Sequence, residues 1–205
     1  MTRALVQTLA PAVVAVLAIG VIIGLFVALI GVSRRREEAM TRAAARWGGW
    51  LVEGGFFSRS YVRLSFAGLP ARLSCFAGGK NAAPFTRVEA DGVPVVTLDV
   101  RARGFFTTIG SWFGTAPVST GDPAVESHFI VYSNSPAFAA RVLRGGVVDA
   151  LRRWYDRDVT LDVSAKQIRV GIVGCLPPDE MRTVQFVEDA ETIVAAVTLT
   201  AAGRA

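Results

Sequence analysis

Residues that could do covalent or metal chemistry are few in this chain, and their spacing matches no familiar site. His128 is the single histidine, so a serine or cysteine nucleophile would have no other imidazole as its base. Because His128 falls within an alternating apolar segment, we expect a structural or surface role for it. Two cysteines and one histidine cannot fill a structural zinc site without carboxylates. The sequence therefore predicts neither a metal site nor a bound cofactor.

Other reactive patterns have simpler explanations. The pairs Asp156/Asp158 and Asp179/Glu180 stand at the ends of predicted elements, where acidic residues cap helices and turns. Gly78–Lys80 lacks the GxxxxGK[ST] spacing that cradles phosphate, and the chain has no GxSxG elbow. We therefore predict that the protein is not an enzyme; the alternative is a catalytic constellation that only the fold assembles.

The two cysteines are predicted to be buried thiols. Cys75 and Cys175 each lie within an apolar run, where a free cysteine acts as a small hydrophobic side chain. A secreted domain could bridge them by a disulfide, whereas the cytoplasm would keep them reduced.

An uncharged N-terminal segment dominates the organisation of the chain. Ala4–Val32 contains no charged residue and is bounded by Arg3 and Arg34. A helix of about 20 apolar residues crosses the hydrocarbon core of a bilayer, and this run is longer. A cleaved signal peptide is the alternative, but its apolar core would be shorter and would not end in arginines. We predict a transmembrane anchor over residues 1–33.

The charges beside the anchor predict its orientation. Arg3 stands alone before it, whereas Arg34–Arg36, Arg42 and Arg46 follow it. Because basic residues collect on the cytoplasmic side, we expect the N-terminus outside and the following domain in the cytoplasm. The strong preference for arginine over lysine, with many alanines and glycines, is typical of a high-GC bacterial genome, which predicts the bacterial inner membrane.

The net charge of +5 does not indicate a nucleic-acid partner. Four of the 22 basic residues flank the anchor, and the others are nearly balanced by 17 acidic residues. A nucleic-acid-binding domain would carry its basic excess on the folded part. We therefore predict no nucleic-acid partner.

Two features of the membrane segment predict contacts. Gly20, Gly24 and Ala28 are spaced four apart, which lets helix backbones approach closely in a homo-oligomer or against a partner's helix. Glycine is also common in membrane helices, which is the simpler explanation. After the anchor, residues 34–49 are predicted to form a basic juxtamembrane helix that ends at Gly48-Gly49. Its arginines, Arg34, Arg35 and Arg36, could contact anionic head groups.

Residues 50–205 are predicted to form one α+β domain, with a mostly antiparallel sheet and helices packed on one of its faces. In the first half, alternation predicts strands at 61–66, 71–76, 86–90 and 93–101. Val62, Leu64 and Phe66 should share the buried side. Asp91-Gly92 predicts a hairpin between the last two of these strands, and Pro94 indicates an edge position or a strand start.

Residues 104–114 break this pattern with aromatic and glycine residues. Phe105, Phe106, Trp112 and Phe113 could lie in the head-group region of the membrane. The alternative is a bulged strand or hairpin that closes one end of the core.

The second half mixes helices and strands. A strand at 127–133 should point Phe129 and Val131 to one side, and Ser135-Pro136 begins a helix. A helix at 147–155 and a hairpin of strands 159–163 and 168–173 follow. Residues 176–180 open the last helix. Its predicted apolar stripe, with acidic residues on other faces, comprises Met181, Val184, Val187, Ala190, Val194 and Val197.

The stretch Gly121–Phe129, with Val131–Ser133, Pro136, Ala140 and Leu143, resembles a pattern in bacterial single-pass membrane-anchored proteins of unknown function. In that pattern a Gly-Asp segment leads into a Phe-x-Val strand, a short helix, a hairpin and a terminal helix. Here Val125-Glu126 replaces the usual Phe-Asp, and Val142 replaces one leucine of a pair. The resemblance implies architecture and no activity: Phe129 and Val131 would be core residues, and Asp122 a turn or cap residue.

These features favour a protein-interaction or accessory-subunit domain on a single membrane helix. The alternative is a membrane-surface or small-ligand binding module that uses the aromatic segment 104–114.

Overall fold

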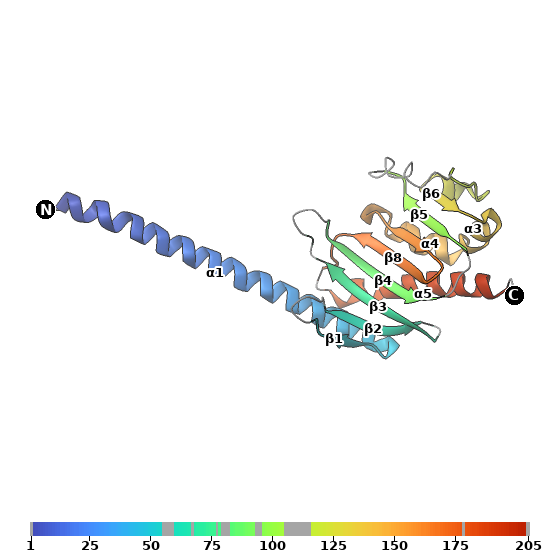
Figure 1. Cartoon of the computed structure of the whole chain (residues 1–205), viewed down its shortest axis with the longest axis horizontal. Coiled ribbons are helices and arrows are strands. Elements are labelled where there is room, and N and C mark those ends of the chain that lie inside the picture. The colour runs from blue at the N-terminus through green and yellow to red at the C-terminus, as the bar shows by residue number, and fades with distance from the viewer. Residues whose placement is uncertain are drawn as a thin grey trace.

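The computed structural model of the chain describes residues 2–54, 60–66, 68–76, 78, 83–92, 96–104, 116–177 and 179–203. Its first element, α1 (Thr2–Ala44), is one continuous helix. From Leu17 onward it is long and apolar enough to cross a membrane. Large apolar side chains between Leu17 and Val27, including Leu25 and Phe26, are more than half exposed. Figure 1 shows the apolar part projecting well away from the folded domain.

The C-terminal end of α1 belongs to the core of the domain. Ala39, Met40, Ala43 and Ala44 are buried there. A short 3-10 helix, η1 (Ala45–Trp47), follows, and Gly48 ends it in the left-handed conformation at φ 64°. Glycine adopts that conformation without the strain of a side chain. The predicted helical extension beyond the anchor, with its stop at Gly48-Gly49, is confirmed.

In the described part of the chain, eight strands form one antiparallel sheet in the order β1-β2-β3-β4-β8-β7-β5-β6 (Figure 1). The strands are β1 (Trp50–Val52), β2 (Tyr61–Phe66), β3 (Leu69–Phe76), β4 (Phe85–Asp91), β5 (Leu98–Ala102), β6 (Phe129–Ser133), β7 (Thr160–Val163) and β8 (Gln167–Val173).

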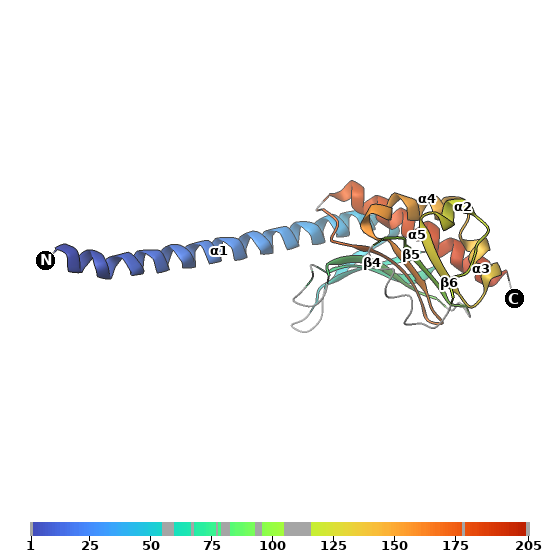
Figure 2. The same ribbon diagram turned by 90° about the horizontal axis from the view of Figure 1, so that it is seen from above.

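All the described helices of the domain lie on one face of this sheet, as Figure 2 shows. They are α2 (Pro123–Glu126), α3 (Pro136–Val142), α4 (Gly146–Arg153), the 3-10 helix η3 (Tyr155–Arg157) and α5 (Glu180–Ala202). α5 packs against α1, α3 and α4. The predicted class, α+β with helices on one face of an antiparallel sheet, is confirmed.

Apolar and polar residues alternate along the strands, and successive side chains point to opposite faces of the sheet. The apolar side chains therefore gather on one face and form the core. Val62, Leu64 and Phe66 of β2 are buried, as predicted, whereas Arg63 and Ser65 between them are exposed. Phe129 and Val131 of β6 are also buried. The helices cover this apolar face, and the opposite face carries the polar residues.

The hairpin predicted at Asp91-Gly92 is wrong. β4 pairs with β3 and β8, whereas β5 pairs with β6 and β7. The six residues after Asp91 can span about 20 Å when extended, enough to carry the chain past β8 and β7 at about 4.8 Å per strand. The Asp-Gly signal predicts a local turn, but the β7–β8 hairpin from later in the chain takes the place beside β4.

The predicted apolar stripe of α5 is partly wrong. Met181 is 78% exposed. Phe186 and Asp189, which the stripe left out, are buried. The reason is tertiary: α5 has core contacts on more than one side, because α1, α3 and α4 all pack against it.

Candidate functional site

The face of the sheet that no described helix covers carries a polar row across all eight strands. In the strand register, the row runs Trp50, Arg63, Arg72, Glu89, Arg169, Asp162, Asp99 and Tyr132. We call this surface the open face. Cross-strand neighbours lie about 5 Å apart, so each residue of the row can interact with the next. Arg63, for example, places its guanidinium 5.6 Å from the centre of the Trp50 ring.

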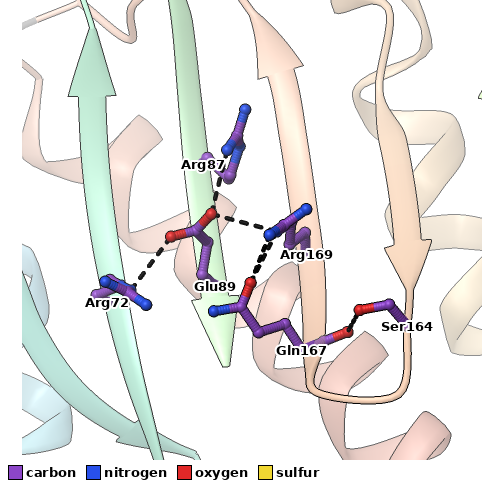
Figure 3. Close-up of polar contacts among 6 residues, drawn as sticks. All are labelled: Arg72, Arg87, Glu89, Ser164, Gln167 and Arg169. Carbon is purple, nitrogen blue, oxygen red and sulfur yellow. Dashed lines mark hydrogen bonds and ion pairs between the residues drawn. The ribbon is translucent and has the colours of Figure 1, made fainter. Parts of the chain in front are cut away.

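At the centre of the open face, three arginines surround a single carboxylate (Figure 3). Glu89 on β4 lies 3.2 Å from Arg72 on β3, 3.1 Å from Arg87 on β4 and 3.3 Å from Arg169 on β8. The Glu89 side chain is 15% exposed, whereas each arginine side chain is more than a third exposed. One carboxylate neutralises one guanidinium, so this arginine cluster keeps an excess positive charge that faces solvent.

Arg169 and Arg87 are held in place by further contacts. Gln167 Oε1 accepts a hydrogen bond from Arg169 Nε at 3.1 Å, and Gln167 itself is fixed through the β7–β8 turn by Ser164 (Figure 3). The Arg87 guanidinium lies 4.4 Å from the centre of the Phe85 ring. Fixed guanidinium groups lose less entropy on binding, which favours their use in recognition.

Toward β5 and β6 the charged residues of the row are acidic instead of basic. Asp99 and Asp162 are directly opposite each other on β5 and β7. Arg101 engages both oxygens of Asp99, at 2.8–3.0 Å. Burial, followed by the nearby Asp99 charge, raises the pKa of Asp162 above its ordinary value. These residues line a pocket of about 300 Å³ where β5 begins and β6 and β7 end.

The predicted helix-contact residues lie on the projecting part of α1. Gly20, Gly24 and Ala28 are exposed. A Cβ added at Gly20 or Gly24 would meet nothing within 4 Å. That surface is therefore free for another helix, and the contact itself stays a prediction.

The three arginines after the apolar segment differ in their surroundings. Arg34 and Arg35 are exposed. Arg36 is half-buried, and its Nε donates a hydrogen bond to the Leu176 carbonyl at 3.1 Å. Arg36 thus ties α1 to the segment before α5. The aromatic residues predicted to touch lipid, Phe105, Phe106, Trp112 and Phe113, lie outside the described residues, as do Pro94 and Lys80.

The structure brings the two cysteines together, although they are far apart in sequence. Cys175 Sγ donates a hydrogen bond to the Phe76 carbonyl at 3.2 Å, next to Cys75. Burial and the hydrogen bond with Cys175 raise the pKa of the Cys75 thiol to about 12. A thiol with so high a pKa is a poor nucleophile at neutral pH.

The other residues that the sequence singled out as reactive or capping make local hydrogen bonds in the fold. His128 Nδ1 lies 2.7 Å from Ser127 Oγ and 3.2 Å from the Ala124 carbonyl. Asp179 caps α5, with its side chain accepting from the Met181 amide at 3.0 Å. Asp122 caps α2 in the same way. Among the described residues, no group of three or more His, Cys, Asp or Glu side chains could hold a metal ion.

Sequence reasoning missed the open face. Each of its charged residues occupies the polar position of an alternating strand, which by itself predicts only solvent exposure. The arginine cluster needs β8 beside β4, and this pairing joins segments about 80 residues apart. The sequence shows Arg87-x-Glu89 on one strand and Arg169 on another, but it does not show that these two strands are neighbours.

The fold is similar to that in the crystal structure of the mycobacterial trehalose monomycolate transport factor A, TtfA. The TM-score is 0.51 at 14% sequence identity, and the similarity covers 81% of this chain and 94% of that chain. No protein-family model matches the chain, and no curated protein matches it in sequence.

Proposed function

We propose that the protein is a single-pass membrane protein whose α+β domain is an accessory subunit that binds a second membrane protein through the open face. The continuity of α1 carries this proposal. One helix leads from the apolar segment into the core, where Ala39, Met40, Ala43 and Ala44 are buried. The domain is therefore held against the bilayer surface in a fixed direction, without a flexible linker.

The direction of the open face favours a neighbour in the same membrane. In Figure 2 the axis of α1 runs close to the horizontal, and the open face, on the side of the sheet opposite the helices, looks sideways from it. If α1 crosses the bilayer, that face points along the membrane surface instead of into the lipid. A protein standing beside the domain would meet the exposed arginine cluster around Glu89.

The charges of the open face favour a protein over a nucleic acid. Arginine-rich surfaces bind carboxylates through paired hydrogen bonds. Asp99 and Asp162 interrupt the basic surface and would repel a phosphate backbone that ran across the row. We expect the partner to place an acidic segment on Arg72, Arg87 and Arg169.

The fold neighbour is compatible with this role. TtfA is named a transport factor, and it shares the fold at low identity. An accessory role in a transport process would agree with that name. The charge flanking α1 further supports an N-terminus outside and a cytoplasmic domain in a bacterial inner membrane.

Replacing Arg72, Arg87 and Arg169 together by glutamine should release the partner. Glutamine can still donate a hydrogen bond to Glu89, so the domain should remain folded while the excess positive charge disappears. The tagged full-length protein would be purified from native membranes in mild detergent, and bound proteins would be identified by mass spectrometry. We expect a stoichiometric partner with the native chain, and at least about a tenfold loss with the triple variant.

A matched control is available on the helix side of the domain. Arg141, Arg144 and Arg152 are exposed there, and replacing them by glutamine removes the same charge. This variant should keep the partner. Purification of the native chain without any second protein would refute the accessory role.

The small-residue face of α1 gives a separate prediction. We propose that Gly20, Gly24 and Ala28 pack against another membrane helix, of the partner or of a second copy. Replacing Gly20 and Gly24 by isoleucine should reduce association in a membrane two-hybrid assay, because the bulkier side chains keep the backbones apart. If the double variant associated as strongly as the native chain, Gly20, Gly24 and Ala28 would not be the contact surface.

A further inference from the structure

The pocket at the acidic end of the open face is a separate site. It lies where the start of β5 meets the ends of β6 and β7, and it has a volume of about 300 Å³. This is at the lower end of the range for small-molecule sites. Its lining includes Asp99, Arg101, Tyr132, Asn134 and Asp162. Its lining contains none of the three arginines that surround Glu89, so the pocket can act independently of the proposed protein partner.

One carboxylate in this pocket is engaged and the other is not. Arg101 binds Asp99 with three short contacts, so that pair is satisfied within the chain. The Asp162 side chain makes no hydrogen bond or ion pair with any other described residue, although its backbone belongs to the sheet. The nearest opposing charge on β8, Arg169, is already bound to Glu89 and Gln167. Asp162 is thus a half-buried acceptor without a donor.

Donors without acceptors lie around Asp162. Arg101 uses Nε and Nη2 on Asp99, which leaves Nη1 without a hydrogen bond among the described residues. Asn134 accepts from the Thr97 amide through Oδ1 at 3.0 Å, so its Nδ2 group remains a donor. The Tyr132 hydroxyl likewise makes no hydrogen bond to a described residue. The pocket therefore combines an acceptor, several donors and an aromatic ring.

This combination restricts the chemistry of a ligand. An anion would face the unpaired Asp162 carboxylate, and a cation would face the Nη1 group of Arg101 that Asp99 does not engage. A hydroxyl group suits both kinds of wall, because it donates to Asp162 and accepts from Arg101 or Asn134. An apolar ring face could pack on Tyr132, whose phenol has an apolar body and a polar tip.

We propose that the pocket between Asp162, Arg101, Asn134 and Tyr132 binds a ligand with neighbouring hydroxyl groups, such as a sugar ring. The Asp162 carboxylate accepts hydrogen bonds from two adjacent hydroxyl groups of the ligand. Arg101 Nη1 and Asn134 Nδ2 donate hydrogen bonds to the oxygens of neighbouring hydroxyl groups. The Tyr132 ring covers one face of the sugar.

The test is a binding titration of the full-length protein by saturation-transfer NMR. A polyoxyethylene detergent is required, because maltoside detergents carry sugar head groups of their own. Glucose and sucrose serve as sugar probes, methylammonium as a cation probe and methyl phosphate, whose methyl protons can be observed, as a phosphate anion probe. We expect saturation transfer to at least one sugar. Asp162→Asn should weaken that binding by about tenfold or more, since a hydrogen bond to a charged acceptor becomes a neutral one.

Asp91→Asn is the matched control. Asp91 lies at the end of β4, in register with Gln167 and outside the pocket, so sugar binding should be unchanged. Tyr132→Leu is a second variant that keeps an apolar side chain and should weaken sugar binding without removing charge. Binding of methylammonium or methyl phosphate in preference to both sugars, sugar binding insensitive to Asp162→Asn, or no binding of either sugar would each overturn the proposal.

Discussion

Replacing Phe186 by alanine is expected to lower the free energy of unfolding by about 3–5 kcal/mol. Phe186 is fully buried in the N-terminal half of α5, and its ring meets the Trp154 ring edge-on at 5.4 Å between centroids. Removing the ring leaves a cavity at the point where α4 and α5 meet over the sheet. Since domains of this size have about 5–15 kcal/mol of stability in total, the variant should lose a large fraction of it.

Urea titration of the full-length protein in mild detergent, followed by tryptophan fluorescence, would measure this change. Met181→Ala on the same helix is the control, because Met181 is largely exposed and its loss should change stability by less than about 0.5 kcal/mol. Equal stability of the Phe186 and Met181 variants would show that α5 does not pack as described.

Replacing Asp189 by alanine is expected to destabilise the protein by about 1–3 kcal/mol. Asp189 is 6% exposed on α5 and accepts hydrogen bonds from Trp154 Nε1 at 2.7 Å and Arg153 Nη1 at 3.1 Å. Alanine would leave the indole N–H of the buried Trp154 without an acceptor. Arg153 can turn to solvent, so its share of the loss is small.

Asp189→Asn separates the hydrogen bond from the charge. The amide oxygen can still accept from Trp154, so this variant should be more stable than Asp189→Ala in the same urea titration. Burial raises the pKa of Asp189 above its ordinary value of 3.8, despite the opposing effect of the Trp154 hydrogen bond. The folded state therefore binds this proton more tightly than the unfolded chain does.

The sign of the pH dependence follows from that raised pKa. The Asp189 carboxyl contributes its full stability below about pH 3.8, where both states are protonated. That contribution is lost as the pH rises through the raised pKa of the folded state. Asp189→Asn does not titrate, so its stability relative to the native chain should increase across this window. An identical pH dependence for the two proteins would contradict this explanation.

Local patterns were sufficient for most elements of the fold. The apolar run of α1, the alternation of β2, β3, β6, β7 and β8, and the proline and glycine signals around α3 each predicted an element that the structure contains. These signals reside in a few consecutive residues, because amphipathic period and chain breaks are local properties. The α+β class followed from the same patterns, since alternating strands need helices to cover their apolar side.

Strand order was decided only in the tertiary structure. Asp91-Gly92 predicted a local hairpin, but β8 lies beside β4 and places Arg169 opposite Glu89. The sequence could not reveal this, because many antiparallel orders bury the same apolar residues and differ only in long-range pairing. The arginine cluster, the Asp99/Asp162 pair and the meeting of Cys75 with Cys175 all depend on that order.

The first and last helices, α1 and α5, show the same division. The sequence by itself determined that an apolar helix is followed by a basic one and that the last helix is amphipathic. Only the folded chain decided that Ala39, Met40, Ala43 and Ala44 of α1 are buried, and that Phe186 and Asp189 of α5 are buried too. A helical pattern specifies which residues share a face, whereas the neighbours on all sides of the helix decide which faces are buried.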